Sequence, residues 1–138
     1  AHPETFQRWS LIPFSFPREA KGAGRITLKS SGLQRRNFVS SAAIADIVGR
    51  CVEGDLAEAS GAINVLGSTT ESVYEFAQRC RKIAEEQLGR PCVVDRPQSS
   101  LDSPNAGIGS DFSLVSRFRQ QRPAEELNDF IKRFIALC

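Results

Sequence analysis

Apolar residues recur every three or four positions over a long stretch in the second half of the chain, which is the period of an amphipathic α-helix. Ser72 and Glu75 open this stretch as a capping box, in which each side chain accepts a hydrogen bond from the other residue's backbone N–H, and Gly89 ends it. The repeated apolar positions are Val73, Phe76, Ala77, Cys80, Ile83, Ala84 and Leu88. The pattern predicts a helix from Val73 to Leu88 that buries one face in the core.

Three weaker patterns predict further helices. Residues from about Trp9 to Ala20 form an apolar helical stretch that Pro17 is expected to interrupt or kink. A helix from Ala42 to Val52 follows Ser40 and Ser41, either of which can cap it. The last helix is expected to begin at Pro123 and to bury Leu127, Phe130, Ile131, Phe134 and Ile135.

Short runs between these helices predict strands. Arg25 to Lys29 alternates polar and apolar residues like a half-buried strand, and three more runs are interpreted as strands. These are Asn37–Val39, Ala62–Leu66 and Cys92–Val94, with loops expected at Lys21–Gly24, Gly67–Thr70 and Arg96–Ser110. The 138 residues therefore predict a single domain, 1–138, of the α+β class, with short strands under about four helices and no doubly wound Rossmann sheet.

Composition and charge exclude several classes of protein. With 41% hydrophobic and 25% charged residues, the chain has a globular composition, and no apolar run approaches the ~20 residues that span a bilayer. A net charge of +2 is too small to direct the chain to nucleic acid. The four cysteines have no C-x-x-C spacing and the single histidine is His2, so no metal site is expected. Apolar neighbours around Cys51, Cys92 and Cys138 suit reduced thiols and favour a cytoplasmic location.

The sequence offers no catalytic or cofactor-binding set. Two glycine pairs, in Lys21–Arg25 and Gly107–Gly109, lack the third glycine of the G-x-G-x-x-G phosphate loop. The single tyrosine, Tyr74, has no nearby lysine that would lower its pKa for proton transfer. We therefore expect this chain alone to bind no nicotinamide cofactor and to catalyse nothing.

Arg35 and Arg36 are the polar pair that best suits ligand binding. A guanidinium presents a rigid fork of donors that matches phosphate oxygens, and a strand holds it more firmly than a loop does. On chemistry alone two other interpretations stay open: a pair of solvated arginines, or a salt bridge to Asp46.

Four segments in order carry a resemblance to a known family: Gly32-Leu33-Gln34-Arg35-Arg36-Asn37-Phe38-Val39, Gly61-Ala62-Ile63-Asn64-Val65, Ser72-Val73-Tyr74-Glu75-Phe76-Ala77 and Asp111-Phe112-Ser113. Together they resemble the substrate-binding half of the extended short-chain dehydrogenase/reductases, the NAD-dependent epimerase/dehydratase family that acts on nucleotide-sugars. The family's Tyr-x-x-x-Lys pair is absent, because Gln78 lies four residues after Tyr74. Asn37 stands where the family usually has an aspartate.

The resemblance implies a substrate-binding role for seven residues. Arg36 would clamp the pyrophosphate, Phe38 belongs to the same motif, and Arg96 is the nearest candidate for a second phosphate-binding arginine. Ser10 and Leu11 would lie at the helix entry that approaches the phosphates, whereas Thr27 and Lys29 would contact the nucleotide base.

The resemblance further implies the substrate domain of an epimerase, dehydratase or reductase. The ligand would be a UDP-, dTDP- or GDP-linked sugar, and NAD(P) would lie on an N-terminal Rossmann domain of the same polypeptide. The absence of any methionine agrees with a downstream piece of such a chain. We expect Leu11, Phe14, Phe16 and Thr27 to face that missing domain, so that the isolated chain is weakly stable or forms a homodimer. The alternative is a stand-alone binding or interaction module that has lost the chemistry.

Overall fold

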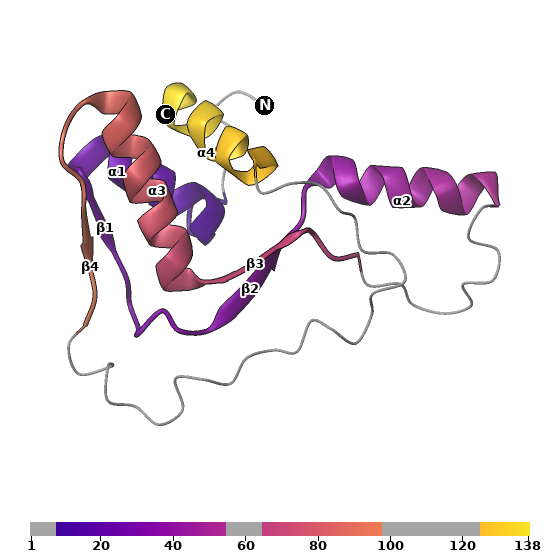
Figure 1. Ribbon diagram of the computed structural model, residues 1–138, viewed down its shortest axis with the longest axis horizontal. Coiled ribbons are helices and arrows are strands. Elements are labelled where there is room, and N and C mark those ends of the chain that lie inside the picture. The colour runs from indigo at the N-terminus through magenta and orange to yellow at the C-terminus, as the bar shows by residue number, and fades with distance from the viewer. Residues whose placement is uncertain (1–7, 55–64, 98–124) are drawn as a thin grey trace.

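The computed structural model describes residues 8–54, 65–97 and 125–138, and in these ranges it contains four helices and two small sheets (Figure 1). The helices are α1 (Ile12–Ala23), α2 (Ser41–Glu53), α3 (Val73–Leu88) and α4 (Glu125–Leu137). The strands are β1 (Arg25–Thr27), β2 (Arg35–Phe38), β3 (Thr69–Ser72) and β4 (Val93–Asp95). The predicted α+β class, with short strands and about four helices, is confirmed.

Helix α3 has the predicted bounds and the predicted caps. The Ser72 N–H donates to Glu75 Oε2 at 2.6 Å, and the Glu75 N–H donates to Ser72 Oγ at 3.1 Å. Gly89 ends the helix with a φ of 62°, a left-handed conformation that glycine adopts without strain. Phe76 is fully buried and Ile83 is 5% exposed, so the core face is also confirmed.

Helix α1 runs through Pro17, so the predicted interruption there is wrong. Pro17 lies in the second turn, where its missing N–H leaves only the carbonyl of Pro13 without a helical partner. The proline is buried on the same side as Phe16 and Ala20, and that packing offsets one lost hydrogen bond. The helix then continues through Lys21–Ala23 of the expected turn and is capped by Gly24.

The two sheets differ in direction. Strands β1 and β4 pair in parallel, with Arg25 opposite Val93, whereas β2 and β3 pair antiparallel, with Arg35 opposite Ser72. In β1 only Ile26 is buried, as the predicted alternation requires.

The described residues cover only the end of one predicted strand. Ala62–Asn64 of the expected strand Ala62–Leu66 lie outside the described residues, and Val65 and Leu66 are not in a strand. The partner of β2 is instead β3, which begins in the expected loop. Its residues, two threonines, a glutamate and a serine, give no apolar signal, because the strand is recognised only by its pairing with β2.

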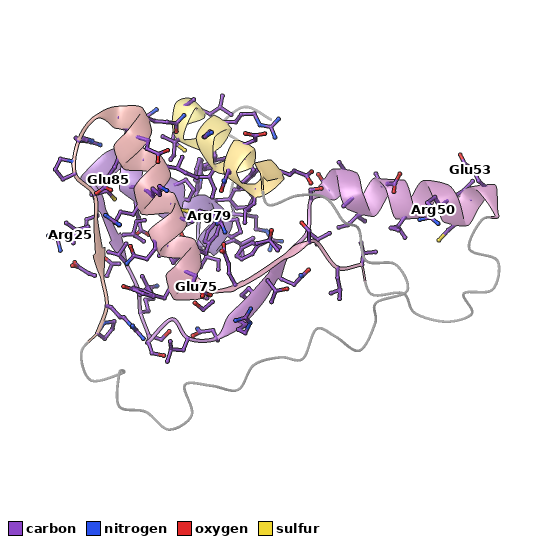
Figure 2. The ribbon with its side chains drawn as sticks, viewed as in Figure 1. Arg25, Arg50, Glu53, Glu75, Arg79 and Glu85 are labelled. Carbon is purple, nitrogen blue, oxygen red and sulfur yellow. The ribbon has the colours of Figure 1, made fainter. Side chains whose placement is uncertain are left out.

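The core lies between α1, α3 and α4, with β1 and β4 at its side (Figures 1 and 2). Phe16 is 5% exposed and stacks on Phe76 with ring centroids 6.0 Å apart, so it belongs to this core and not to the surface expected to face another domain. Helix α2 extends away from the core in Figure 1 and exposes Ile44, Val48 and Val52. No described helix is both long and apolar enough to cross a membrane.

Candidate functional site

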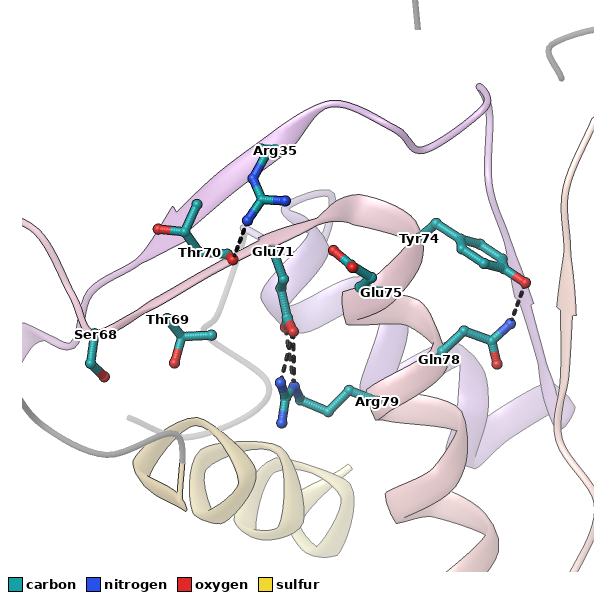
Figure 3. A pocket seen from close by; sticks show the side chains of 9 residues that line it. All are labelled: Arg35, Ser68, Thr69, Thr70, Glu71, Tyr74, Glu75, Gln78 and Arg79. Atoms are coloured by element: carbon teal, nitrogen blue, oxygen red, sulfur yellow. Dashed lines mark hydrogen bonds and ion pairs between the residues drawn. The ribbon is translucent and has the colours of Figure 1, made fainter. Parts of the chain in front are cut away.

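A pocket of ≈ 580 Å³ that is wide open to solvent lies beside β3 and the first half of α3 (Figure 3). Hydroxyl and amide groups line it together with four charged side chains, and we call it the polar cavity. The uncharged lining residues are Ser68, Thr69, Thr70, Tyr74 and Gln78, and the charged ones are Arg35, Glu71, Glu75 and Arg79.

Glu71 and Arg79 neutralise each other. Arg79 Nη2 lies 2.7 Å from Glu71 Oε2, and its Nε donates to both carboxylate oxygens at 3.1 and 3.2 Å. Arg79 Nη1 also donates to Asn128 Oδ1 of α4 at 2.9 Å. The hydrogen bond to Glu71 raises the pKa of Arg79, so the guanidinium stays charged. This network connects β3, α3 and α4, and we assign it a structural role.

Glu75 is committed to capping α3. The hydrogen bond from the Ser72 backbone N–H is the main reason that the pKa of the Glu75 carboxyl lies below its usual range. Glu75 is therefore an anion at neutral pH, and Arg35 is one of the cations that stabilise it.

Arg35 is the cation of the polar cavity that stays available. Its Nη2 donates to the Thr70 carbonyl oxygen at 2.8 Å, and among the described residues it forms no ion pair. A guanidinium carries five N–H donors, so most of them remain open to a ligand. Figure 3 shows the side chain pointing from β2 toward Thr70 on β3, and Arg35 lines the polar cavity.

Asn37 holds the backbone at the start of β3 in place through several hydrogen bonds. Its Nδ2 donates to the carbonyl oxygens of Gly67 at 3.0 Å and Thr69 at 3.2 Å, and to Thr70 Oγ1 at 2.7 Å. Its Oδ1 accepts the Gly67 N–H at 2.7 Å. The asparagine that departs from the family motif therefore uses both its donors and its acceptor, which a carboxylate could not do.

A second cavity, of ≈ 440 Å³, lies between the starts of α1, α2 and α4, and we call it the aromatic cavity. Phe14, Phe38 and Phe130 contribute rings to it. Ser68 and Thr69 line both cavities, so the two adjoin across the start of β3.

The structure separates the residues singled out by the family motif. Arg36 follows Arg35, and successive strand residues face opposite sides. Arg36 is exposed, donates from Nη1 to the Arg35 carbonyl oxygen at 3.0 Å, and lines neither cavity. The Phe38 ring stacks on the Phe76 ring, with centroids 4.6 Å apart, and Phe38 also lines the aromatic cavity.

Thr27, Lys29 and Arg96 gather at the carboxyl edge of the parallel strand pair. Leu28 N donates to the Asp95 carbonyl oxygen at 2.9 Å, so the residues after β1 and β4 lie side by side. The Arg96 guanidinium lies 4.6 Å from the ring centroid of Tyr74, which lines the polar cavity. Arg96 Nε is buried and has no hydrogen-bond partner among the described residues. Of these three residues, Arg96 is thus connected to the polar cavity.

Ser10 and Leu11 lie just before α1, are exposed, and line neither cavity. Leu11 is the N-cap residue of α1 and offers no side-chain cap. Of the seven predicted positions, Phe38 lines the aromatic cavity, Arg96 contacts the ring of Tyr74, and the other five line neither cavity.

The sequence-based prediction named Arg35 only as one of a pair with Arg36 and Asn37 only as a departure from the family motif, and it did not identify the pair formed by Glu71 and Arg79. Strand alternation was the available signal, because it indicates that only one of two successive arginines faces a given side. The motif match favours Arg36, and no local pattern identifies the partners of Asn37 or Glu71.

Comparison with known proteins identified no relative: no protein-family model, no curated protein and no solved structure matches this chain. The described residues also contain no cluster of three His, Cys, Asp or Glu side chains suited to a metal ion.

Proposed function

We propose that this chain is the substrate-binding part of an NAD(P)-dependent nucleotide-sugar epimerase, dehydratase or reductase and is not catalytic alone. The observation that carries the proposal is the polar cavity, in which the guanidinium of Arg35 lies among hydroxyl and amide groups, bonds the Thr70 carbonyl oxygen and forms no ion pair with another described residue.

The lining matches a phosphate-bearing sugar. A guanidinium binds phosphate oxygens through paired, charge-assisted hydrogen bonds. Ser68, Thr69 and Thr70 offer hydroxyls, and Gln78 offers an amide, groups that both donate to and accept from sugar hydroxyls. The volume of ≈ 580 Å³ falls in the range of roughly 300–1,000 Å³ that is typical of small-molecule sites.

Further cations favour an anionic ligand. Arg36 is next along the strand, Arg96 stacks on Tyr74, and Lys29 follows β1. None of the three forms an ion pair with another described residue, and Arg96 lies beside the polar cavity through its contact with Tyr74, so its positive charge would attract a nucleotide diphosphate.

Redox chemistry is assigned to another part of the polypeptide. Tyr74 Oη accepts a hydrogen bond from Gln78 Nε2 at 2.8 Å, which places an amide where a catalytic tyrosine would need a lysine. The proposal therefore puts NAD(P) and the catalytic pair on an N-terminal Rossmann domain.

Calorimetry with UDP-, dTDP- and GDP-sugars tests the proposal. Arg35→Ala should weaken the preferred nucleotide-sugar about ten- to hundredfold, because a charge-assisted hydrogen bond contributes about 1.5–3 kcal/mol. Arg36→Ala reports on the arginine that the motif predicts, and Lys at either site should restore only part of the affinity. Arg50→Ala, on the exposed part of α2, is the matched control.

Two results would contradict the proposal. One is a wild-type chain that binds none of the three nucleotide-sugars. The other is unchanged affinity in both arginine variants, which would mean that the guanidinium groups are merely solvated. If Arg36→Ala weakened nucleotide-sugar binding and Arg35→Ala did not, the phosphate would be assigned to the opposite face of β2.

The second candidate is a stand-alone interaction module. It is favoured by α2, whose Ile44, Val48 and Val52 repeat every fourth residue and are 43%, 56% and 83% exposed. An upstream reading frame that encodes a glycine-rich βαβ unit and a Tyr-x-x-x-Lys pair would exclude this candidate. Supplying that region should also raise the melting temperature of the domain, whereas an independent module would be unaffected.

A further inference from the structure

The polar cavity and the aromatic cavity meet at Ser68 and Thr69, although their walls differ in chemistry. One contains the guanidinium of Arg35 among hydroxyls, and the other contains three phenylalanine rings. We infer that the two cavities form one bipartite site, in which the aromatic cavity takes the nucleobase of a ligand whose phosphate and sugar lie in the polar cavity. The inference rests on the proposed function.

The rings of the aromatic cavity come from three different elements. Phe14 lies on α1, Phe38 on β2 and Phe130 on α4, and all three side chains are only partly buried. The Phe14 and Phe130 rings meet edge to face, with centroids 5.9 Å apart. Partly exposed rings with fixed neighbours are suitable platforms for a planar base, because every base has a π-face that stacks on an aromatic side chain.

Polar side chains that line the aromatic cavity could form hydrogen bonds with the edge of a base. Ser41, Thr69 and Arg133 line the aromatic cavity, and they supply hydroxyls and a guanidinium. Arg133 uses Nε to bond the Asp129 carbonyl oxygen at 3.3 Å, which leaves its terminal N–H groups for acceptors on the ligand. The Ser40 hydroxyl, in contrast, is occupied in accepting the Ala43 N–H at 3.1 Å.

The wall between the cavities is rigid. Asn37 bonds both backbone groups of Gly67, and a Cβ at position 67 would lie 1.7 Å from the Phe38 carbonyl oxygen. The backbone there is therefore fixed before a ligand arrives, and a preformed wall lowers the entropic cost of binding. A ribose that links a base to a phosphate would cross this wall at Ser68 and Thr69.

This placement differs from the one that the family resemblance implies. By that resemblance the base contacts Thr27 and Lys29, which line neither cavity. The two placements therefore make opposite predictions for the same set of variants.

Filling the aromatic cavity tests the inference without disturbing the core. Ala42 is exposed and lines the cavity, so Ala42→Phe should block it. Ala45→Phe, three residues later on α2, is the matched control because Ala45 is exposed and does not line either cavity. The probes are UDP, dTDP and GDP, with inorganic pyrophosphate as the probe that has no base, and calorimetry measures each affinity.

Ala42→Phe is expected to weaken the preferred nucleoside diphosphate about 5- to 150-fold, since stacking on aromatic side chains contributes a factor of this size per base. Pyrophosphate binding should not change in this variant, whereas Arg35→Ala should weaken both probes. Phe14→Leu, which removes one ring and keeps an apolar side chain, should reproduce the selective loss. It serves as the second variant if Ala42→Phe fails to fold.

Unchanged nucleoside diphosphate affinity in Ala42→Phe and Phe14→Leu would overturn the inference. If Thr27→Ala weakened that affinity at the same time, the base would lie where the family resemblance implies. Arg35→Ala separates this failure from that of the proposed function, because it would still weaken binding if only the base were misplaced. A wild-type chain that binds no nucleoside diphosphate would overturn both.

Discussion

Gly67 approaches the end of β2 more closely than a side chain would permit. A Cβ atom there would lie 1.7 Å from the carbonyl oxygen of Phe38 and 2.7 Å from its carbonyl carbon. Both obstacles are backbone atoms, so a larger residue would have to displace the strand or the loop. The glycine is thus required by space, and it shapes the wall that both cavities share.

We expect Gly67→Ala to lower the free energy of unfolding by about 1–3 kcal/mol, the usual cost of overpacking. Gly22→Ala is the matched control, because a Cβ at this helical position meets nothing within 4 Å. The control should raise stability by about 0.5–1 kcal/mol, since alanine loses less backbone freedom than glycine. Urea unfolding followed by circular dichroism measures both variants. Equal stability of Gly67→Ala and wild type would mean that the loop moves aside freely.

At the scale of single residues, the sequence indicated which residue types could bind a ligand better than it indicated what each side chain contacts. It predicted a strand at Asn37–Val39, directly after two arginines, and favoured Arg36, whereas both arginines lie within β2 and Arg35 lines the polar cavity. Asn37 was recognised only as a departure from a motif. Its four hydrogen bonds reach residues 30 to 33 positions away, and no local pattern reveals partners at that distance.

At the scale of elements, local signals decided which predictions were correct. Helix α3 was predicted to the residue, because its capping box, apolar period and terminal glycine all lie within the element. Strand β3 was missed, because its four polar residues are held by a partner strand more than 30 positions earlier. Pro17 misled the prediction for α1, since a proline signals a break whether or not the surrounding packing offsets its cost.

The cap of α3 predicts a pH dependence of stability. The pKa of Glu75 is lowered in the folded chain, mainly by the Ser72 N–H, so its contribution is present above the usual glutamate pKa of about 4.3 and is lost as the pH falls through the lower, folded value. Glu75→Gln keeps an acceptor but no titrating group. Its unfolding midpoint in urea should therefore fall less than that of wild type between about pH 5 and pH 3.

Glu86→Gln is the control for this experiment. Glu86 lies on the same helix and is exposed, and the described residues offer it no ion pair. Its variant should follow the wild-type pH profile. Identical profiles for Glu75→Gln and wild type would remove the capping carboxylate as a source of the pH dependence.

At the scale of the whole molecule, the four cysteines divide into two classes. Cys80 and Cys92 are 0% and 5% exposed in the core, and burial raises the pKa of both thiols. Cys51 on α2 and Cys138 after α4 are exposed, although both have apolar neighbours in the sequence. Local composition could not separate these classes, because exposure depends on which faces of the helices meet.

A thiol reagent such as Ellman's reagent should distinguish the two classes. We expect Cys51 and Cys138 to react with it in the folded chain because both are exposed, and Cys80 and Cys92 only after unfolding because both are buried. Burial also raises the pKa of Cys138, and the thiolate is the reactive form, so Cys138 should react more slowly than Cys51. Cys51→Ser and Cys138→Ser should each remove one equivalent that reacts in the folded chain. Rapid reaction of all four thiols under native conditions would contradict this core.

Helix α4 completes the core from a distant part of the chain. Lys21 Nζ donates to the carbonyl oxygen of Ala136, which lies 115 positions later in the sequence. Ile131 and Ile135 are buried in the same core cluster as Phe16 and Phe76. At a synthesis rate of about 5–20 residues per second, Lys21 of α1 is made roughly 6–23 seconds before Ala136 of α4. During that interval the apolar side chains of α1 and α3 have no α4 to pack against, and exposed apolar surface of this kind makes an incompletely folded chain prone to aggregation.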